Sequence, residues 1–336
     1  LYLYGDMDME QKLMELDENY LGDYDKIEMD SHIDYQQNFS KPVIVHKDYP
    51  IASEESIESK TYLSCNYVVG RALDLKQNVA FGILDQVLLN SSGAPLRQAL
   101  VDADIATEVC GGFDDGTLQP TFSIYLKGSE EKYLDIFQEI IRTTLLQQVH
   151  DGIDSLALQG IINVLEFRFR EADFGNYPKG LIYGLQLLDG WLYDKDQPFG
   201  HLHMLQILSE LKEKITKGYF EELITKYLLD NSHTSIVILH PKQGLNTIEE
   251  NLLKEKLATY KASLSSKEVE VIVEDTKHLK EYQSTPSTQE ELATIPMLSR
   301  NDLRREVLCF QNMRTTKDGV EYIYHDYETN GIHYLN

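Results

Sequence analysis

The side chains of this sequence that could do chemistry are its histidines, cysteines and acidic residues, and their spacing matches no familiar catalytic site. None of the ten histidines has a second histidine four residues away, the spacing that sets two imidazoles on one helix face around zinc. His201 and His203 are the closest pair, and on a helix their side chains would diverge by about 200°. We therefore interpret them as residues beside an amphipathic stripe.

Two further patterns resemble binding motifs but lack essential positions. The segment Cys110–Gly116 contains Gly111, Gly112 and Gly116, without the glycine spacing of a dinucleotide site or the Lys-Ser/Thr of a phosphate-binding loop. Its glycines predict a plain loop. Asp6, Asp8 and Glu10 begin like a calcium loop, but the sixth-position glycine and twelfth-position glutamate are missing. Acidic residues at a helix N-terminus explain them through the helix dipole.

The most unusual polar segment is residues 163–181. A helix that carries Glu166 and Arg170, spaced for an ion pair, is interrupted by Gly175, Pro178 and Gly180 before helical spacing resumes. The favoured interpretation is a corner between two helices with surface ion pairs. The functional alternative is a polar corner that faces a substrate cavity.

Composition limits the class of protein. The 336 residues suggest two compact units, and a hydrophobic fraction of 42% is enough for real cores. Asp and Glu number 55 against 31 Lys and Arg, a net charge of −24 that argues against unspecific binding of nucleic acid or an anionic membrane. The sequence has no apolar run long enough to span a bilayer and no recognisable secretory leader. Three well-separated cysteines, Cys65, Cys110 and Cys309, form no closed disulfide framework and favour a reducing compartment.

The elements that would position these residues follow from hydrophobic periodicity. Strands are predicted at 1–5, 42–46, 61–69, 121–126, 234–239 (ending at Pro241), 306 onward and 331–336. Helices are predicted at 8–20, 79–88, 95–103, 134–149, 154–169, 181–192, 202–215 and 219–229. This order excludes a doubly wound nucleotide fold. It predicts an α+β protein with a mixed or antiparallel sheet covered by helices on one face.

The segment after residue 245 is more charged. Thr247 with Glu250 and Ser265 with Glu268 match capping boxes that would open helices at 249–263 and 267–283. The short join predicts an antiparallel helical hairpin. Strand-like residues at both ends of the chain favour the hypothesis that it is a piece of a longer polypeptide.

Several segments together resemble the insulinase/pitrilysin-type zinc metallopeptidases, in the branch of presequence protease and falcilysin. The resemblance runs in order along nearly the whole chain, through segments at 4–6, 92–100, 119–128, 166–181, 292–299 and 318–332. It implies four related α/β domains in two halves that close around a peptide chamber. Residues 1–40 would be the end of the preceding catalytic-type domain and a linker, and 41–245 a non-catalytic α+β domain. Residues 246–300 would be the hairpin linker and 301–336 the first strands of the next domain.

The family's zinc motif, H-x-x-E-H, is absent from this sequence. We therefore expect no catalytic, cofactor-binding or metal-ligating residue here, with zinc bound only by parts of the full-length protein outside this chain. The expected function is the chamber wall and hinge of a zinc-dependent oligopeptidase that encloses and degrades unstructured peptides. Expected partners are peptides, including basic ones, and the remaining domains of the same polypeptide, with no nucleic acid and no membrane. The compartment would be the cytoplasm in a bacterium, or the mitochondrial or plastid matrix in a eukaryote.

Two alternatives remain open. The chain could come from a catalytically inactive relative that acts as a scaffold or partner subunit, and an H-x-x-E-H upstream in the reading frame would decide against this. A weaker alternative is an unrelated enzyme that uses the region of His201 and His203 or of Cys110, which metal analysis would test.

Overall fold

The computed structural model describes residues 1–303, 306, 312–327 and 329–335. The chain divides into two compact units, one made of Leu1–Gln243 with Asn330–Asn336 and the other of Gly244–Thr329. The assignment of residues 1–40 and 301–336 to neighbouring domains stays a prediction.

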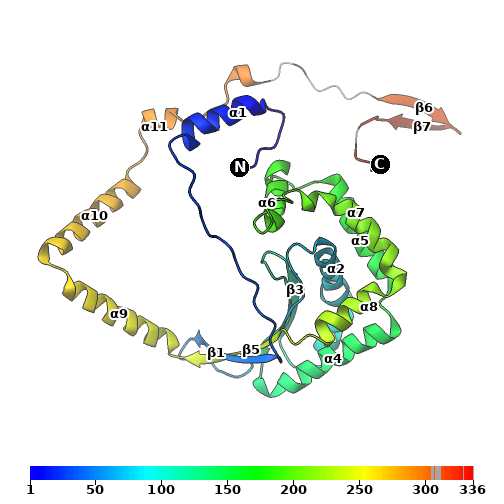
Figure 1. Ribbon diagram of the computed structural model, residues 1–336, viewed down its shortest axis with the longest axis horizontal. Helices are drawn as coiled ribbons and strands as arrows, with labels where there is room; N and C mark the ends of the chain where they lie inside the picture. Colours follow the sequence, from blue (N-terminus) through cyan, green and yellow to red (C-terminus); the bar gives the residue numbers. More distant parts are fainter. Residues whose placement is uncertain (304–305, 307–311, 328, 336) are drawn as a thin grey trace. The chain divides into compact units, whose positions relative to one another are not determined.

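A five-stranded mixed sheet organises the first unit, in the order β1-β5-β2-β4-β3 (Figure 1). The edge strand β1 runs parallel to β5, whereas β2 is antiparallel to both β5 and β4, and β3 is antiparallel to β4. The bounds are β1 Val43–Ile51, β2 Thr61–Val68, β3 Glu108–Asp114, β4 Thr121–Ser129 and β5 Thr234–Gln243.

Helices cover one face of this sheet, and the hydrophobic core lies between them. Helices α2, α4 and α8 lie on this side, and α5 and α7 pack on α2 (Figure 1). Their apolar residues recur at the helical period, so a single stripe of each helix faces the core. The helices of the unit are α1 Met9–Leu16, α2 Leu75–Asp85, α3 Pro95–Asp102, α4 Leu134–Asp151, α5 Ser155–Glu171, α6 Lys179–Trp191, α7 Met204–Lys214 and α8 Tyr219–Ile224. Five-residue π turns extend α1, α2 and α8, at Asp17–Leu21, Gln86–Asn90 and Thr225–Leu229. This confirms the predicted α+β architecture.

The opposite face of the sheet keeps its side chains partly exposed. Strand β2 alternates strictly between buried and half-buried residues, and β4 and the first half of β5 do the same. Successive strand residues point to opposite faces, so one face packs on the helices and the other stays accessible. We call the second face the open face.

The second unit contains the charged helices and a small hairpin. Helix α9 spans Leu245–Ser263, α10 spans Ser266–Ser284 and α11 spans Gln289–Ala293. Strands β6 (Met313–Lys317) and β7 (Val320–Tyr324) pair antiparallel around a tight turn. Both α9 and α10 are present with a short join, but neither buries a residue, so their antiparallel packing stays a prediction.

The glycine-rich segment from Cys110 was predicted to be a loop, and this was wrong. It forms strand β3, which pairs with β4 over its whole length. A Cβ at Gly111 would stand 2.6 Å from the carbonyl oxygen of Ser123 and 2.7 Å from Leu89 Cδ1. Glycine is therefore used here for close approach of the strand to its neighbours and not for a turn.

Other boundaries also need correction. Strand β5 does not stop at Pro241 but continues to Gln243 beside β1, and Thr247 lies inside α9, whose N-cap is Gly244. Residues 1–4 and 332–335 are not in strands. A strand needs a partner for its backbone groups, and none of the described strands pairs with either segment. The prediction from residue 306 onward falls partly on residues outside those described.

Candidate functional site

The open face of the sheet presents a continuous polar and aromatic surface. The registers place Ser64 of β2 opposite Tyr125 of β4 and Val237 of β5, and Asn66 opposite Ser123 and Ser235. All of these side chains are half-buried and point away from the helices. The open-face residues used below are Tyr62, Ser64, Asn66, Cys110, Ser123, Tyr125, Lys127, Ser235 and Val237.

Backbone carbonyls and neighbouring side chains hold the centre of this face in place. Asn66 Nδ2 donates to Ser64 Oγ at 3.0 Å and to the carbonyl oxygen of Ser235 at 3.3 Å. Tyr62 contacts Tyr49 edge to face, with ring centroids 5.2 Å apart. The amide, hydroxyl and phenol groups are thus pre-positioned on rigid strands, where they could contact an extended backbone.

A charged group lies towards the β3 edge of the open face. Lys127 Nζ lies 3.1 Å from Glu108 Oε2, and Cys110 Sγ donates to Glu108 Oε1 at 2.9 Å. The hydrogen bonds from Cys110 and Lys127 lower the pKa of Glu108, and the bond to Glu108 raises the pKa of Lys127. Burial, followed by the bond to Glu108, raises the pKa of the Cys110 thiol. A thiol whose anion is disfavoured is a poor nucleophile, so the group offers hydrogen bonds and no covalent catalysis.

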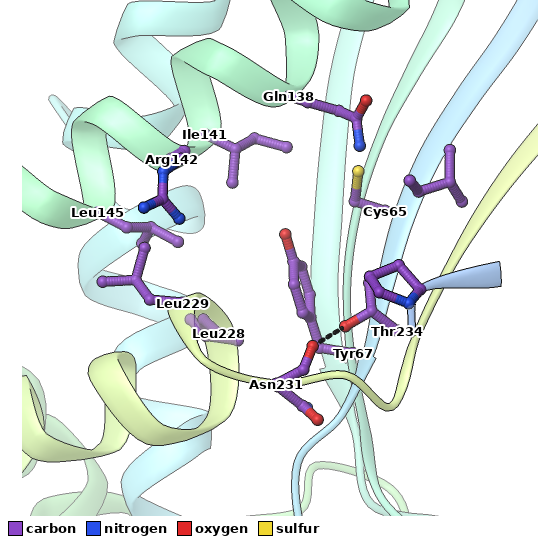
Figure 2. Close-up of a pocket in the computed structure, with 12 residues that line it drawn as sticks. Cys65, Tyr67, Gln138, Ile141, Arg142, Leu145, Leu228, Leu229, Asn231 and Thr234 are labelled. Carbon is purple, nitrogen blue, oxygen red and sulfur yellow. Dashed lines mark hydrogen bonds between the residues drawn. The ribbon is translucent and has the colours of Figure 1, made fainter. Parts of the chain in front are cut away.

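On the helix side of the sheet, a cavity of about 210 Å³ lies between α4 and strands β2 and β5 (Figure 2). Cys65 and Tyr67 line it from β2, and Ile141 and Arg142 from α4. Burial raises the pKa of Cys65 to about 12 and raises the pKa of Tyr67 as well. Neither group ionises near neutral pH, so this small and largely apolar cavity supplies no nucleophile.

The polar corner at residues 163–181 is structural, as the favoured interpretation predicted. Glu166 accepts from Arg170 Nε at 3.0 Å and pairs with Lys212 of α7, so one carboxylate joins α5 to α7. These two cations lower the pKa of Glu166. Helix α5 ends at Glu171 and α6 begins at Lys179, so the predicted break is confirmed.

The other sequence candidates are not brought together. His201 and His203 lie in a 3₁₀ turn at Gly200–His203 and not on a helix, and neither belongs to a metal-sized donor group among the described residues. Burial lowers the pKa of His201. Asp8 caps α1 by accepting from the amide of Gln11 at 3.0 Å, so it is a helix cap as expected. None of the described helices is long and apolar enough to cross a membrane.

Sequence reasoning did not single out the open face, although the sequence contained a signal for it. Strand β2 reads apolar and polar in alternation, with Leu63 and Cys65 on one side and Ser64 and Asn66 on the other. That alternation indicates one solvated face. The register that aligns Ser64 with Tyr125 and Val237 depends on pairing between distant strands, which the pattern alone does not specify.

Comparison with known proteins identifies the fold and the family. A family model described as Peptidase M16 inactive domain matches residues 1–165, and a second model, for the region associated with subfamily C of the M16 peptidases, matches residues 239–336. Solved structures share the fold: a protease from Helicobacter pylori has a TM-score of 0.52 at 15% identity, covering 70% of this chain and 54% of that one. A conserved protein from Enterococcus faecalis V583 has a TM-score of 0.50 at 16% identity, covering 71% of this chain and 51% of its own.

Curated relatives align along the full chain. Protein HypA of Clostridium perfringens is 39% identical over 336 residues, which is 100% of this chain and 34% of that protein. Presequence protease 1, chloroplastic/mitochondrial, of Arabidopsis thaliana is 32% identical, covering 99% of this chain and 32% of that protein. The chain thus spans about a third of the length of these relatives. It belongs to the M16 peptidase family, in the presequence protease branch, and comprises a non-catalytic part of such a peptidase.

Proposed function

We propose that this chain forms a wall of the peptide chamber in a presequence protease-like oligopeptidase, and that the open face is the surface that contacts the peptide. The observation that carries the proposal is the alternation on β2, β4 and β5, which leaves one whole face half-exposed although the other is fully packed. The membership of the chain in a peptidase family supports peptide as the ligand.

The chemistry of the open face suits an unstructured peptide. Hydroxyl and amide groups such as Ser64 and Asn66 pair with backbone groups irrespective of sequence, and Tyr62 and Tyr125 offer aromatic contact area. A wall of this kind would hold many different peptides weakly, as an enclosing peptidase requires.

Much of the acidic charge of the chain lies in its N-terminal segment, away from this face. Residues 1–40 contain eleven Asp and Glu against two Lys, whereas the charged group of the open face is the pair Glu108 and Lys127. We propose that any attraction of basic peptides arises mainly from the N-terminal segment and that the open face itself is close to neutral.

Catalytic zinc would be bound by parts of the polypeptide outside this chain. The family's inverted motif is absent from the sequence, and no described helix offers two histidines and a glutamate on one face. The residues present therefore do not fit a catalytic zinc centre, and no step of peptide hydrolysis is assigned to them. We further propose that α9 and α10 act as the hinge, and that the compartment is the cytoplasm or an organellar matrix.

A binding experiment tests the wall proposal on this chain. Anisotropy of a fluorescent, unstructured peptide should report weak binding that Tyr125→Ala reduces severalfold. Tyr177→Ala is a matched control because Tyr177, in the loop before α6, is 66% exposed and lies off the sheet. Equal effects of the two substitutions would refute the assignment of the open face. Peptide hydrolysis by this chain alone, abolished by a chelator, would refute the non-catalytic role.

A further inference from the structure

We propose that His46, Glu131 and His240 form a binding site for a divalent transition-metal ion, with Zn²⁺ as the best fit. His46 lies on the edge strand β1, and His240 lies on β5, its parallel neighbour (Figure 1). Glu131 lies in the 3₁₀ turn Glu131–Tyr133 that leads into α4. This site is independent of the proposed peptide-binding face and of any catalytic centre.

The three side chains converge on one point. His46 Nδ1 lies 3.1 Å from His240 Nε2 and 3.9 Å from Glu131 Oε1, and His240 Nδ1 lies 3.9 Å from Glu131 Oε2. Donor atoms around a tetrahedral zinc ion, each at about 2.0–2.1 Å, are separated by roughly 3.3 Å. The histidine nitrogens already have this separation, and the carboxylate needs to move by about half an ångström.

The strand register explains why the histidines meet. His46 is aligned with Ile238 and His240 with Asp48, so the two histidines are diagonal neighbours on the same face. Their rings are parallel within 4°, with centroids 5.4 Å apart. Because β1 lies at the sheet edge, these side chains are not covered: His46 is 51% exposed, Glu131 53% and His240 29%. The site is therefore open to an ion and retains room for a water as a fourth ligand.

The donor set selects the class of ion. Two imidazole nitrogens and one carboxylate oxygen favour borderline ions such as Zn²⁺, whereas Ca²⁺ and Mg²⁺ prefer oxygen ligands throughout. Two neutral imidazoles and one carboxylate leave one negative charge, which suits a dication. The nearest further ion pair, Lys242 with Asp48 at 2.6 Å, is already internally neutralised. Ion binding would tie the edge strand β1 to β5 and to the start of α4.

Isothermal titration with Zn²⁺ on the 336-residue chain tests this proposal. One ion should bind per chain, and His46→Ala, His240→Ala or Glu131→Gln should each weaken binding by at least the roughly 10–100-fold that loss of even an outer-shell partner costs. His150→Ala is the matched control, since His150 is an exposed histidine 2.6 Å from a single carboxylate, Asp151, and belongs to no described group of three donors. It should leave the affinity unchanged.

Two further readouts keep the result unambiguous. Circular dichroism should confirm that the variants fold, which their exposed positions favour. Co²⁺ in place of Zn²⁺ should give the strong visible absorption of a four-coordinate site, and His240→Ala should remove it. Absence of stoichiometric binding, or equal loss with His150→Ala, would overturn the proposal and leave only a histidine pair joined by a hydrogen bond. Neither outcome bears on peptide binding by the open face.

Discussion

Replacing Phe122 by alanine should destabilise the first unit far more than replacing Tyr125, three residues along the same strand. Phe122 points to the helix face, is 0% exposed and lies 6.2 Å from the ring of Phe81, measured between centroids. Truncation of a fully buried phenylalanine costs about 3–5 kcal/mol, because it removes transfer energy and leaves a cavity. Tyr125 is half-buried on the open face. About half of the roughly 1.5–3 kcal/mol for full burial of a large side chain gives about 1 kcal/mol.

Urea denaturation followed by far-UV circular dichroism measures both values, from the midpoint and slope of each transition. The expected result is a large fall in the midpoint for Phe122→Ala, a small one for Tyr125→Ala, and unchanged slopes. A loss of more than about 3 kcal/mol for Tyr125→Ala would mean that its side of the sheet is covered in solution. In that case the open face would not be available to a peptide, and the wall proposal would fail with it.

Three other predictions follow from particular contacts. Asp154→Ala should cost about 1 kcal/mol of unfolding free energy, since Asp154 Oδ1 accepts from the amides of Leu156 at 2.8 Å and Ala157 at 3.3 Å to cap α5; chemical denaturation measures this, with Asp196→Ala in the loop after α6 as a control. The pKa of Glu166 is lowered in the folded state, so its ion pairs contribute stability that is present above the ordinary glutamate pKa and lost as the pH falls through the folded value; thermal melts of Glu166→Gln and the parent chain should therefore differ at neutral pH and converge in acid. Iodoacetamide should modify the half-buried Cys110 in the native state but modify Cys65 only on unfolding, because Cys65 is 2% exposed and burial raises its pKa to about 12; peptide mapping by mass spectrometry decides this, and early labelling of Cys65 would contradict the packing at β2.

Much of the fold could be predicted because local and tertiary preferences agree. The stripe on α4 and the alternation on β2 each specify one element and one buried face, and both elements are present. Asp154 and Ser265 cap the helices that they were predicted to cap. The glycines of β3 misled the analysis, because glycine marks both turns and close approach. Only the contact of Gly111 with Ser123 and Leu89 distinguishes the two.

The candidate sites were harder to predict, since they depend on strand pairing between distant segments. Ser64 and Tyr125 share a face only through the register of β2 and β4, and His46 meets His240 only because β1 runs parallel to β5. Neither histidine has a metal-like neighbour in the sequence. The expectation that this chain has no metal ligands rested on local spacing alone, and the proposed site at His46, Glu131 and His240 revises it for a non-catalytic ion.

The most direct test of the central claim is site-specific photo-crosslinking to a bound, unstructured peptide in the intact polypeptide that contains this chain. A photoreactive phenylalanine placed at Tyr62 or Tyr125 on the open face should capture the peptide. The same group at Leu156 of α5, which is 77% exposed away from the sheet, should not. Capture at Leu156 with none at Tyr62 or Tyr125 would contradict the assignment of the open face as the chamber wall.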